Sequence, residues 1–302
     1  MAGRYLKAVL WRFLLPLLAV CIVSCDSGSG TEKPAEPRID LTAIFPGSTM
    51  VVVRPGVEWV SFHGEWEGQI RNINIVKASL DSHNRLGIYY DYGETDDFIT
   101  KKCEFLDALA GTNGPMACCQ YVRVDGVTMR VANKQDPWIV NCALTIDDGV
   151  PDIVKVADNF AAASLKNQNV GAAGPLLVLD GEIQNYPDWE DEDFIKTTHP
   201  RTAFGISQDR KTVFLVTVDG RWSTTASDKT AVGMEIPVLA RLMKDIGCYK
   251  ALNFDGGGGT AMWIYEEGVN GIVNHPCDKP QDWYNPTLRT CGSAIYIYSD
   301  LK

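Results

Sequence analysis

Histidine and basic residues are scarce in this sequence. Its four histidines, at positions 63, 83, 199 and 275, do not have the spacing of metal ligands, and no Cys-x-x-Cys pair is present. A zinc site is therefore a weaker interpretation of the cysteines than a disulfide. Lysine and arginine together number 28 against 38 acidic residues. The chain therefore lacks the basic face that a general nucleic-acid binder needs. We expect no nucleic-acid partner, and nothing in the sequence demands a metal or another cofactor.

Long hydrophobic runs are also missing. An apolar run extends from Phe13 to Val23 and contains Pro16. It is about half the length of the roughly 20 apolar residues that a membrane-spanning helix requires. Arg4, Lys7 and Arg12 precede it, as in the basic start and short apolar core of a secretory signal peptide. We therefore interpret residues 1–24 as a signal peptide, with a buried hydrophobic helix as the alternative.

The residue that follows this segment indicates lipidation. Ser24-Cys25 resembles the cleavage site of bacterial lipoproteins, in which the cysteine receives the lipid and becomes the first mature residue. A plain secretory signal is the alternative. Residues 25–45 are predicted to be a flexible tether, because the stretch after Cys25 is rich in Ser, Gly, Pro and Glu. The expected location is the envelope of a Gram-negative bacterium, at the periplasmic or surface face of the outer membrane. The lipid on Cys25 is then the only expected contact with the membrane.

Residues 46–302 are predicted to form a single α+β domain. Aromatic residues make up 10% of the chain, with eight tryptophans, which excludes a disordered protein. Short β-rich runs punctuated by Gly, Asn, Asp and Pro predict mostly short, mixed or antiparallel strands with a few flanking helices. The predicted helices are Lys101–Ala110, Asp158–Lys166 and one that Pro237 opens and Gly247 ends. The predicted strands are Met50–Arg54, Val57–Phe62, Ile73–Leu80, Leu86–Tyr90, Gln120–Val124, Trp138–Ile146, Leu176–Leu179, Ala203–Ser207, Thr212–Val218, Ala251–Phe254, Ala261–Tyr265 and Gly292–Tyr298.

Seven of the nine cysteines remain once Cys21 leaves with the signal and Cys25 takes the lipid. An exported chain meets an oxidising compartment, so disulfides can form, and an odd number leaves at least one free thiol. Cys277 and Cys291 flank a polar loop and are the favoured disulfide pair.

The strongest chemical signal is the segment Asn253-Phe254-Asp255, followed by Gly256, Gly257, Gly258, Gly259 and Thr260. Asn253 and Asp255 are two residues apart, so both point to the same face at the end of a strand. The glycines can adopt conformations closed to other residues and turn their N–H groups inward as an anion-binding nest. The segment therefore predicts a carboxylate, an amide and backbone donors close together. A plain flexible turn is the alternative.

Arginines stand at two other predicted strand ends. His199-Pro200-Arg201-Thr202 leads into one strand, and Asp219-Gly220-Arg221 follows the next. The planar guanidinium group binds phosphate or carboxylate through two parallel hydrogen bonds. Both arginines are candidates for an anion site, although either one alone is also consistent with an ordinary surface position.

The order of these motifs resembles the phosphodiester glycosidase family over about Ile73 to Tyr298. The matching segments are His-Pro-Arg-Thr-Ala-x-Gly, a hairpin, Val-Asp-Gly-Arg, a helix, Ala-Leu-Asn-Phe-Asp-Gly-Gly-Gly and Val-Asn-His-Pro, with Asn113-Gly114 and Gly174-Pro175 upstream. The chain departs from the family where Gly259 replaces the usual serine and Val238 an acidic residue. It departs again at Pro115-Met116, where the family has small and aromatic residues.

The resemblance implies an enzyme without a cofactor that hydrolyses a sugar-1-phosphodiester at the glycosidic C–O bond. The sugar would be released from a phosphorylated glycan or a related exported substrate. Its phosphate leaving group is already a stable anion and needs positive charge more than a general acid. Asp255 is the first candidate for the catalytic carboxylate and Asp219 the second, with the holding of an arginine as the alternative role of Asp219. The expected substrate-binding residues are Arg201 and Arg221 for the phosphate, with Thr202, Asn253, Gly256, Gly257, Gly258, Gly259, Thr260, Asn113 and Asn274.

A non-catalytic surface lipoprotein that binds glycans or glycosyl phosphates is the alternative function. In that case sugars could stack on tryptophans, although each is individually more consistent with core packing: Trp189, Trp222, Trp263 and Trp283. Capture of an anion does not require a carboxylate such as Asp255 beside the glycines, which favours the enzyme.

A phosphomonoesterase or nuclease is the third interpretation and the weakest, because it would need clustered metal ligands and the histidines are scattered. The acidic run from Asp188 to Asp193 is predicted to be a solvated loop, with a cation site as the alternative.

Overall fold

The computed structural model of the protein describes residues 39–80, 83–93, 97–133, 140–186, 192–223 and 227–301. Three antiparallel sheets and five short α-helices make up this part of the chain. The predicted signal peptide, Cys25 and residues 25–38 of the tether lie outside the described residues. The predicted tether is wrong at its end, because residues 41–44 form a short helix and Leu41 and Phe45 are buried in the core. Within the described part, no helix is long and apolar enough to cross a membrane.

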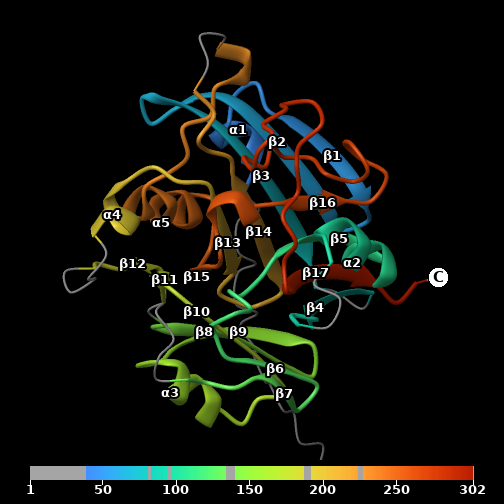
Figure 1. The fold of residues 1–302 in the computed structure, drawn as a ribbon, viewed down its shortest axis with the longest axis vertical. Helices are drawn as coiled ribbons and strands as arrows, with labels where there is room; N and C mark the ends of the chain where they lie inside the picture. Colours follow the sequence, from blue (N-terminus) through green and yellow to red (C-terminus); the bar gives the residue numbers. More distant parts are fainter. Residues whose placement is uncertain are drawn as a thin grey trace, which may run out of the picture. The chain divides into compact units, whose positions relative to one another are not determined.

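The largest sheet has eight strands in the order β1-β2-β3-β14-β13-β15-β11-β12, and every neighbouring pair is antiparallel (Figure 1). Its centre is buried on both faces, so β14 is apolar at nearly every position. The strands are β1 (Thr49–Arg54), β2 (Val57–Trp66), β3 (Gln69–Ser79), β11 (Leu176–Leu179), β12 (Glu182–Ile183), β13 (Arg201–Ile206), β14 (Thr212–Val218) and β15 (Lys250–Asn253).

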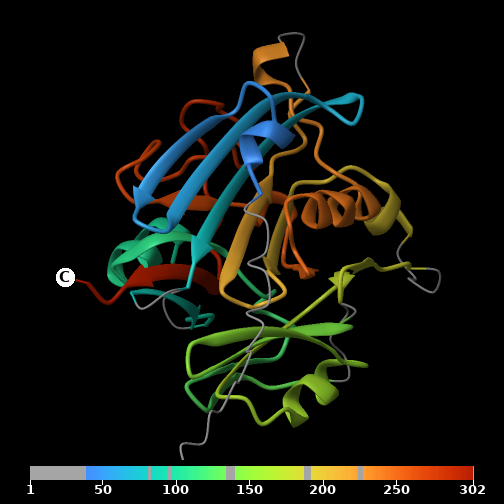
Figure 2. The same cartoon turned by 180° about the vertical axis from the view of Figure 1, so that it is seen from behind.

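Two smaller sheets complete the fold. The five-stranded sheet has the order β7-β6-β10-β8-β9 and lies below the eight-stranded sheet in both Figure 1 and Figure 2. The four-stranded sheet has the order β16-β5-β17-β4. Their strands are β4 (Asn84–Tyr90), β5 (Ala108–Asn113), β6 (Val122–Val124), β7 (Val127–Arg130), β8 (Cys142–Asp147), β9 (Val150–Lys155), β10 (Asn169–Ala173), β16 (Met262–Ile264) and β17 (Ser293–Ser299).

The helices are short, and the longest of them packs on the eight-stranded sheet. Leu239, Leu242 and Met243 of α5 are fully buried there, and burial of each such side chain is worth roughly 1.5–3 kcal/mol. Gly247, with a φ of 100°, follows the helix in the left-handed conformation that favours glycine. The helices are α1 (Leu41–Ile44), α2 (Ile99–Phe105), α3 (Asn159–Ser164), α4 (Glu192–Lys196) and α5 (Ile236–Asp245).

The main core joins all three sheets. Leu215 of β14, Leu144 of β8 and Ile295 of β17 are fully buried in one cluster. The opposite face of the eight-stranded sheet is covered by α5 in a second cluster. In β3 the residues Ile73 and Ile75 belong to the second cluster, whereas Val76 and Ala78 belong to the first. β3 is therefore buried on both faces. The predicted α+β class is confirmed.

One predicted helix is wrong in its second half. The helix predicted over Lys101–Ala110 ends at Phe105, and β5 begins at Ala108. Asp107 turns the chain with a left-handed φ of 49°. Ala108–Asn113 then pairs with both β16 and β17. Tertiary pairing therefore overrides the helical preference of Ala and Leu. The strands β7, β9, β10 and β12 were not predicted. The start of the strand predicted over Trp138–Ile146 lies outside the described residues.

Candidate active site

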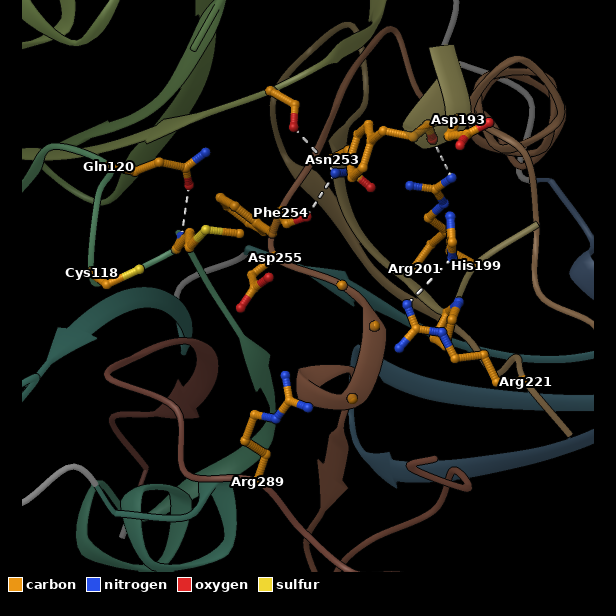
Figure 3. Close-up of a pocket in the computed structure, with 17 residues that line it drawn as sticks. Cys118, Gln120, Asp193, His199, Arg201, Arg221, Asn253, Phe254, Asp255 and Arg289 are labelled. Atoms are coloured by element: carbon orange, nitrogen blue, oxygen red, sulfur yellow. Dashed lines mark hydrogen bonds between the residues drawn. The ribbon is translucent and has the colours of Figure 1, made fainter. Parts of the chain in front are cut away.

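A cavity of about 500 Å³ opens at one edge of the eight-stranded sheet, a size typical of small-molecule sites. Antiparallel pairing brings three strand ends together there. Arg201 at the start of β13 pairs with Val218 at the end of β14, and Asn253 at the end of β15 pairs with Ala203. Residues next to these ends line the cavity, and side chains from other segments, among them Cys118, Asp193 and Arg289, complete its wall (Figure 3).

Asp255 is the partly buried carboxyl group of this cavity. It follows β15 by two residues and lines the cavity together with Asn253. Its backbone is fixed from both sides, since Asn113 Nδ2 donates to its carbonyl at 2.6 Å and its N–H donates to the Gly114 carbonyl at 3.4 Å. Burial raises the pKa of Asp255 to about 6, although the Gly256 N–H and the charge of Arg289 favour the ionised form. At neutral pH the group is therefore mostly ionised and close to its titration range.

The glycine segment is a tight turn whose N–H groups are largely used within the protein. Gly257 to Gly259 form one 3-10 turn. The N–H groups of Gly257, Gly259 and Thr260 donate to the carbonyls of Pro200, Gly256 and Gly257 at 3.0–3.2 Å. The predicted nest of inward glycine N–H groups is therefore wrong for Gly257 and Gly259. Gly256, Gly257 and Gly258 line the cavity, whereas the buried Gly259 and Thr260 are not part of its lining.

The missing side chains of this turn allow two guanidinium groups to approach its backbone. A β-carbon at Gly257 would lie 3.4 Å from both terminal nitrogens of Arg221. A β-carbon at Gly258 would overlap Oδ1 of Asp278 and lie 2.5 Å from Nη2 of Arg289. Arg221 and Arg289 both line the cavity (Figure 3). The backbone of the turn therefore lies between the guanidinium groups of Arg221 and Arg289.

Each of these arginines is held by a specific contact. Arg289 forms a two-pronged ion pair with Asp278, with Nε–Oδ2 and Nη2–Oδ1 distances of 2.8 and 2.7 Å. Arg221 has a left-handed φ of 63°, which costs a non-glycine residue roughly 1–2 kcal/mol, and its Nη2 donates to Nδ1 of His199 at 3.3 Å. Sequence reasoning missed Arg289, because only the fold brings it to Asp255. The only sequence feature that points to Arg289 is its position across the polar loop from Asp278, and such a spacing of opposite charges is a weak signal of an ion pair.

Asn253 contributes an unused acceptor. Its Nδ2 donates to the carbonyls of Gly174 and Phe254 at 3.2 and 2.7 Å. Its Oδ1 is buried without a hydrogen-bond partner, and burial of such an atom is costly unless a ligand satisfies it. The position of Asn253 in the lining makes it a candidate for a sugar hydroxyl or amide N–H.

Comparison with known proteins adds the family. The model of the phosphodiester glycosidase family matches residues 107–298, which is more than half of the chain and includes each of the cavity residues discussed above. This chain belongs to the phosphodiester glycosidase family. No curated protein sequence matches the chain.

Solved structures show the same fold at low sequence identity. The catalytic domain of zebrafish N-acetylglucosamine-1-phosphodiester alpha-N-acetylglucosaminidase, auto-inhibited by its pro-peptide, is 17% identical with a TM-score of 0.60, covering 83% of this chain and 87% of that one. A Synechocystis protein is 11% identical with a TM-score of 0.58, covering 84% and 64%. A Burkholderia pseudomallei protein is 14% identical with a TM-score of 0.52, covering 76% and 74%.

Arg201 has a different environment from the one predicted. It lines the cavity but is only 1% exposed. Its Nε donates to the Met234 carbonyl at 2.8 Å, and its Nη2 donates to those of Phe194 and Thr197 at 2.6 and 3.1 Å. Burial lowers the pKa of Arg201 to about 9, which still leaves it charged at neutral pH. These contacts of Nε and Nη2 anchor the α4 segment.

Several predicted substrate-binding residues form the frame of the site instead. Asn113 Oδ1 accepts from Thr202 Oγ1 at 2.9 Å and from the Ala261 N–H at 3.2 Å, while its Nδ2 holds the Asp255 carbonyl. Thr202 and Thr260 are fully buried and do not line the cavity. The amide of Asn113 is therefore engaged in positioning Asp255 and does not face the sugar in the large cavity.

Asp219 and Asn274 also lie outside the cavity lining. The Asp219 carboxyl group accepts from Asn72 Nδ2 at 2.6 Å, Asn274 Nδ2 at 2.7 Å and the His275 N–H at 2.7 Å. Burial raises its pKa and lowers that of His275. Contrary to the prediction, Asp219 contacts neither a substrate space nor an arginine through these bonds, but ties the loop at His275 to β3.

The predicted disulfide is not formed in this structure, because Cys277 and Cys291 are not joined by an S–S bond. Their side chains pack in separate clusters, Cys277 with Trp222 and Trp283, and Cys291 against Cys103 and its neighbours. The polar loop is closed instead by the Asp278–Arg289 ion pair and a β-bridge between Asp278 and Thr287.

The remaining predictions concern the tryptophans and the acidic run. Trp222 and Trp263 are buried, Trp283 stacks on His275 at 3.7 Å, and none of the three lines the cavity. Trp189 and positions 188–191 of the acidic run lie outside the described residues, while Asp193 reaches the cavity rim. In the described part of the chain, no group of three or more His, Cys, Asp or Glu side chains could hold a metal ion.

Proposed function

We propose that this protein hydrolyses a sugar-1-phosphodiester at the glycosidic C–O bond and releases the sugar from a phosphorylated glycan or a related exported substrate. One observation carries the proposal. A partly buried carboxyl group and two guanidinium groups line a single cavity around the glycine turn: Asp255, Arg221 and Arg289. Membership of the family supports the reaction class. The zebrafish relative, by its name, acts on an N-acetylglucosamine phosphodiester.

The two arginines would hold the phosphate. Planar guanidinium groups bind phosphate oxygens through paired hydrogen bonds. They are worth most when they are fixed before the reaction, because no reorganisation is then needed as charge develops on the leaving group. Asp278 and His199 supply that fixation for Arg289 and Arg221. In this arrangement Arg289 replaces Arg201 as the second phosphate ligand of the proposal.

Asp255 would stabilise the positive charge that develops on the sugar, or accept the proton of the attacking water. Both roles require the ionised carboxylate, and a pKa of about 6 leaves about nine-tenths of the group ionised at pH 7. A base with a pKa near the working pH transfers protons most effectively. The unused Oδ1 of Asn253 would accept a hydrogen bond from the same sugar.

The test uses UDP-N-acetylglucosamine and simple α-glycosyl methyl phosphodiesters, with free sugar and free phosphate followed separately. Asp255→Asn should lower kcat by at least about 100-fold without weakening substrate binding. Arg221→Ala and Arg289→Ala should raise KM. Arg241→Ala is the matched control, because Arg241 pairs with Glu67 at the surface, away from the cavity, and both constants should stay unchanged.

Two results would contradict the proposal. One is binding of these phosphodiesters with no release of sugar, which is expected of a glycan-binding lipoprotein. The other is full turnover by a folded Asp255→Asn variant, which would make Asp255 a structural residue of the glycine turn.

The location is proposed from the sequence alone. A lipid on Cys25 would hold the protein at the cell envelope, and residues 25–38 would separate the lipid from the domain, because Leu41 and Phe45 already belong to its core. The substrate would then be exported or surface material rather than a cytoplasmic metabolite.

A further inference from the structure

A second cavity shares Asp255 with the large one. It has a volume of about 110 Å³, which is room for about three water molecules at roughly 30 Å³ each. Met116, Cys118 and Asp255 line both cavities, so these three residues form the boundary between them. The wall of the small cavity otherwise comes from Tyr92, Asn113, the loop at Gly114–Ala117 and residues 290–293.

The two cavities differ in charge. The large one contains Arg201, Arg221, Arg289 and His199. Among the described residues that line the small one, Asp255 carries the only carboxylate, and none is Lys, Arg or His. The remaining polar side chains there include the hydroxyl groups of Tyr92, Thr290 and Ser293. A phosphate would gain no cation in the small cavity, whereas a neutral molecule that carries a hydroxyl group could hydrogen-bond to its wall.

Rigid contacts define the small cavity. Ser293 Oγ donates to the Pro115 carbonyl at 2.5 Å, and the Gly114 N–H donates to the Ser293 carbonyl at 3.3 Å. A β-carbon at Gly292 would lie 2.7 Å from that of Ala117, so residue 292 must be glycine for the two segments to approach this closely. The cavity is therefore bounded by β17 and the loop after β5, and Asn113 at the end of β5 holds the backbone of Asp255.

We propose that the small cavity is the binding site of the nucleophile, a water molecule or a small alcohol, next to Asp255. This inference rests on the proposed function and adds to it the side from which the second substrate enters. The anomeric C–O bond breaks, and its electron pair leaves with the phosphate oxygen. A new bond forms between the anomeric carbon and the nucleophile oxygen, and the proton of the nucleophile passes to the Asp255 carboxylate. Water gives the free sugar, and an alcohol gives an alkyl glycoside with the same phosphate monoester.

The test measures the partition between these two products. The enzyme is incubated with UDP-N-acetylglucosamine in water containing either methanol or glycerol, and free sugar and alkyl glycoside are quantified by mass spectrometry. Thr290→Trp reduces the space in the small cavity, Tyr92→Ala enlarges it, and Thr290→Val keeps its size. Because the readout is a ratio of products, it does not depend on how much of a variant is folded.

We expect Thr290→Trp to lower the ratio of glyceryl glycoside to free sugar by at least tenfold, with a smaller effect on methanol. Tyr92→Ala, at a side chain that is 46% exposed, should raise the glycerol ratio. Thr290→Val should keep the partition within about twofold, and KM for the phosphodiester should change little in all three variants. Equal ratios in every variant, with hydrolysis intact, would overturn the inference alone. Absence of sugar release by the wild type would overturn the proposed function, and the inference with it.

Discussion

Replacement of Asp255 by asparagine should stabilise the folded protein at neutral pH while it removes activity. The unfolded carboxyl group titrates near 3.8, and burial raises its pKa to about 6 in the folded state. At 1.36 kcal/mol per pKa unit, ionisation of the buried group costs the folded state about 3 kcal/mol at pH 7. Asparagine has a similar shape and no charge, so the variant avoids this cost.

The sign of the pH dependence follows from linkage. The folded state binds the proton of Asp255 more tightly than the unfolded state does, so this group lowers stability as pH rises from about 4 to about 6. The stability gain of Asp255→Asn should therefore be full above about pH 6 and should fade towards pH 4. For a domain of this size 1 kcal/mol shifts Tm by about 2–4 °C, which gives a rise of roughly 6–12 °C at pH 7.

Thermal unfolding at pH 7.5 and pH 4, followed by circular dichroism, measures both features. The control is Asp282→Asn at an exposed site, where hydrogen bonds from the N–H groups of Tyr284 and Asn285 lower the pKa of Asp282, so this variant should not gain stability at pH 7.5. A Tm for Asp255→Asn that is unchanged or lower at pH 7.5, or a gain of equal size at both pH values, would refute the argument that burial of an ionised carboxylate is costly here.

The remaining predictions concern the turn, the arginines, the pH profile and the anchor. Gly258→Ala should lower kcat/KM at least tenfold, because the new β-carbon displaces the Asp278–Arg289 ion pair. Gly259→Ala is the control and should retain activity, because its β-carbon makes only an ordinary 3.5 Å contact with Asp255. Similar kinetics for the two variants would contradict this. Arg201→Met should cost on the order of 3 kcal/mol of unfolding free energy in urea titrations, because three carbonyls lose a charged donor, and an unchanged midpoint would argue against the anchoring role. The pH profile of kcat/KM should fall below about pH 6 as Asp255 is protonated, and activity that rises on acidification would assign it to the acid role instead. Cys25→Ala should move the protein from the detergent phase to the aqueous phase with the domain still folded, and equal partition of variant and wild type would refute lipidation.

The local patterns of the sequence were sufficient to predict the central strands and the position of Asp255 in the site. A strand has a period of two residues, so Asn253 and Asp255 had to share a face, and both line the cavity. The hairpin of β13 and β14 and the amphipathic helix α5 could be predicted in the same way. In each of these cases the signal lies within a few neighbouring residues.

Only the tertiary structure determined which partners the polar side chains hydrogen-bond to. Arg201 and Asn113 have the right chemistry for a ligand, yet the fold surrounds them with buried carbonyls, an N–H group and a threonine hydroxyl that need partners. Arg289 reaches Asp255 through an ion pair with Asp278 at the turn of Gly258, a meeting of segments far apart in the chain. Sequence motifs specify which groups are available near a strand end, but the cost of leaving a buried polar atom without a partner depends on neighbours that only the folded chain supplies.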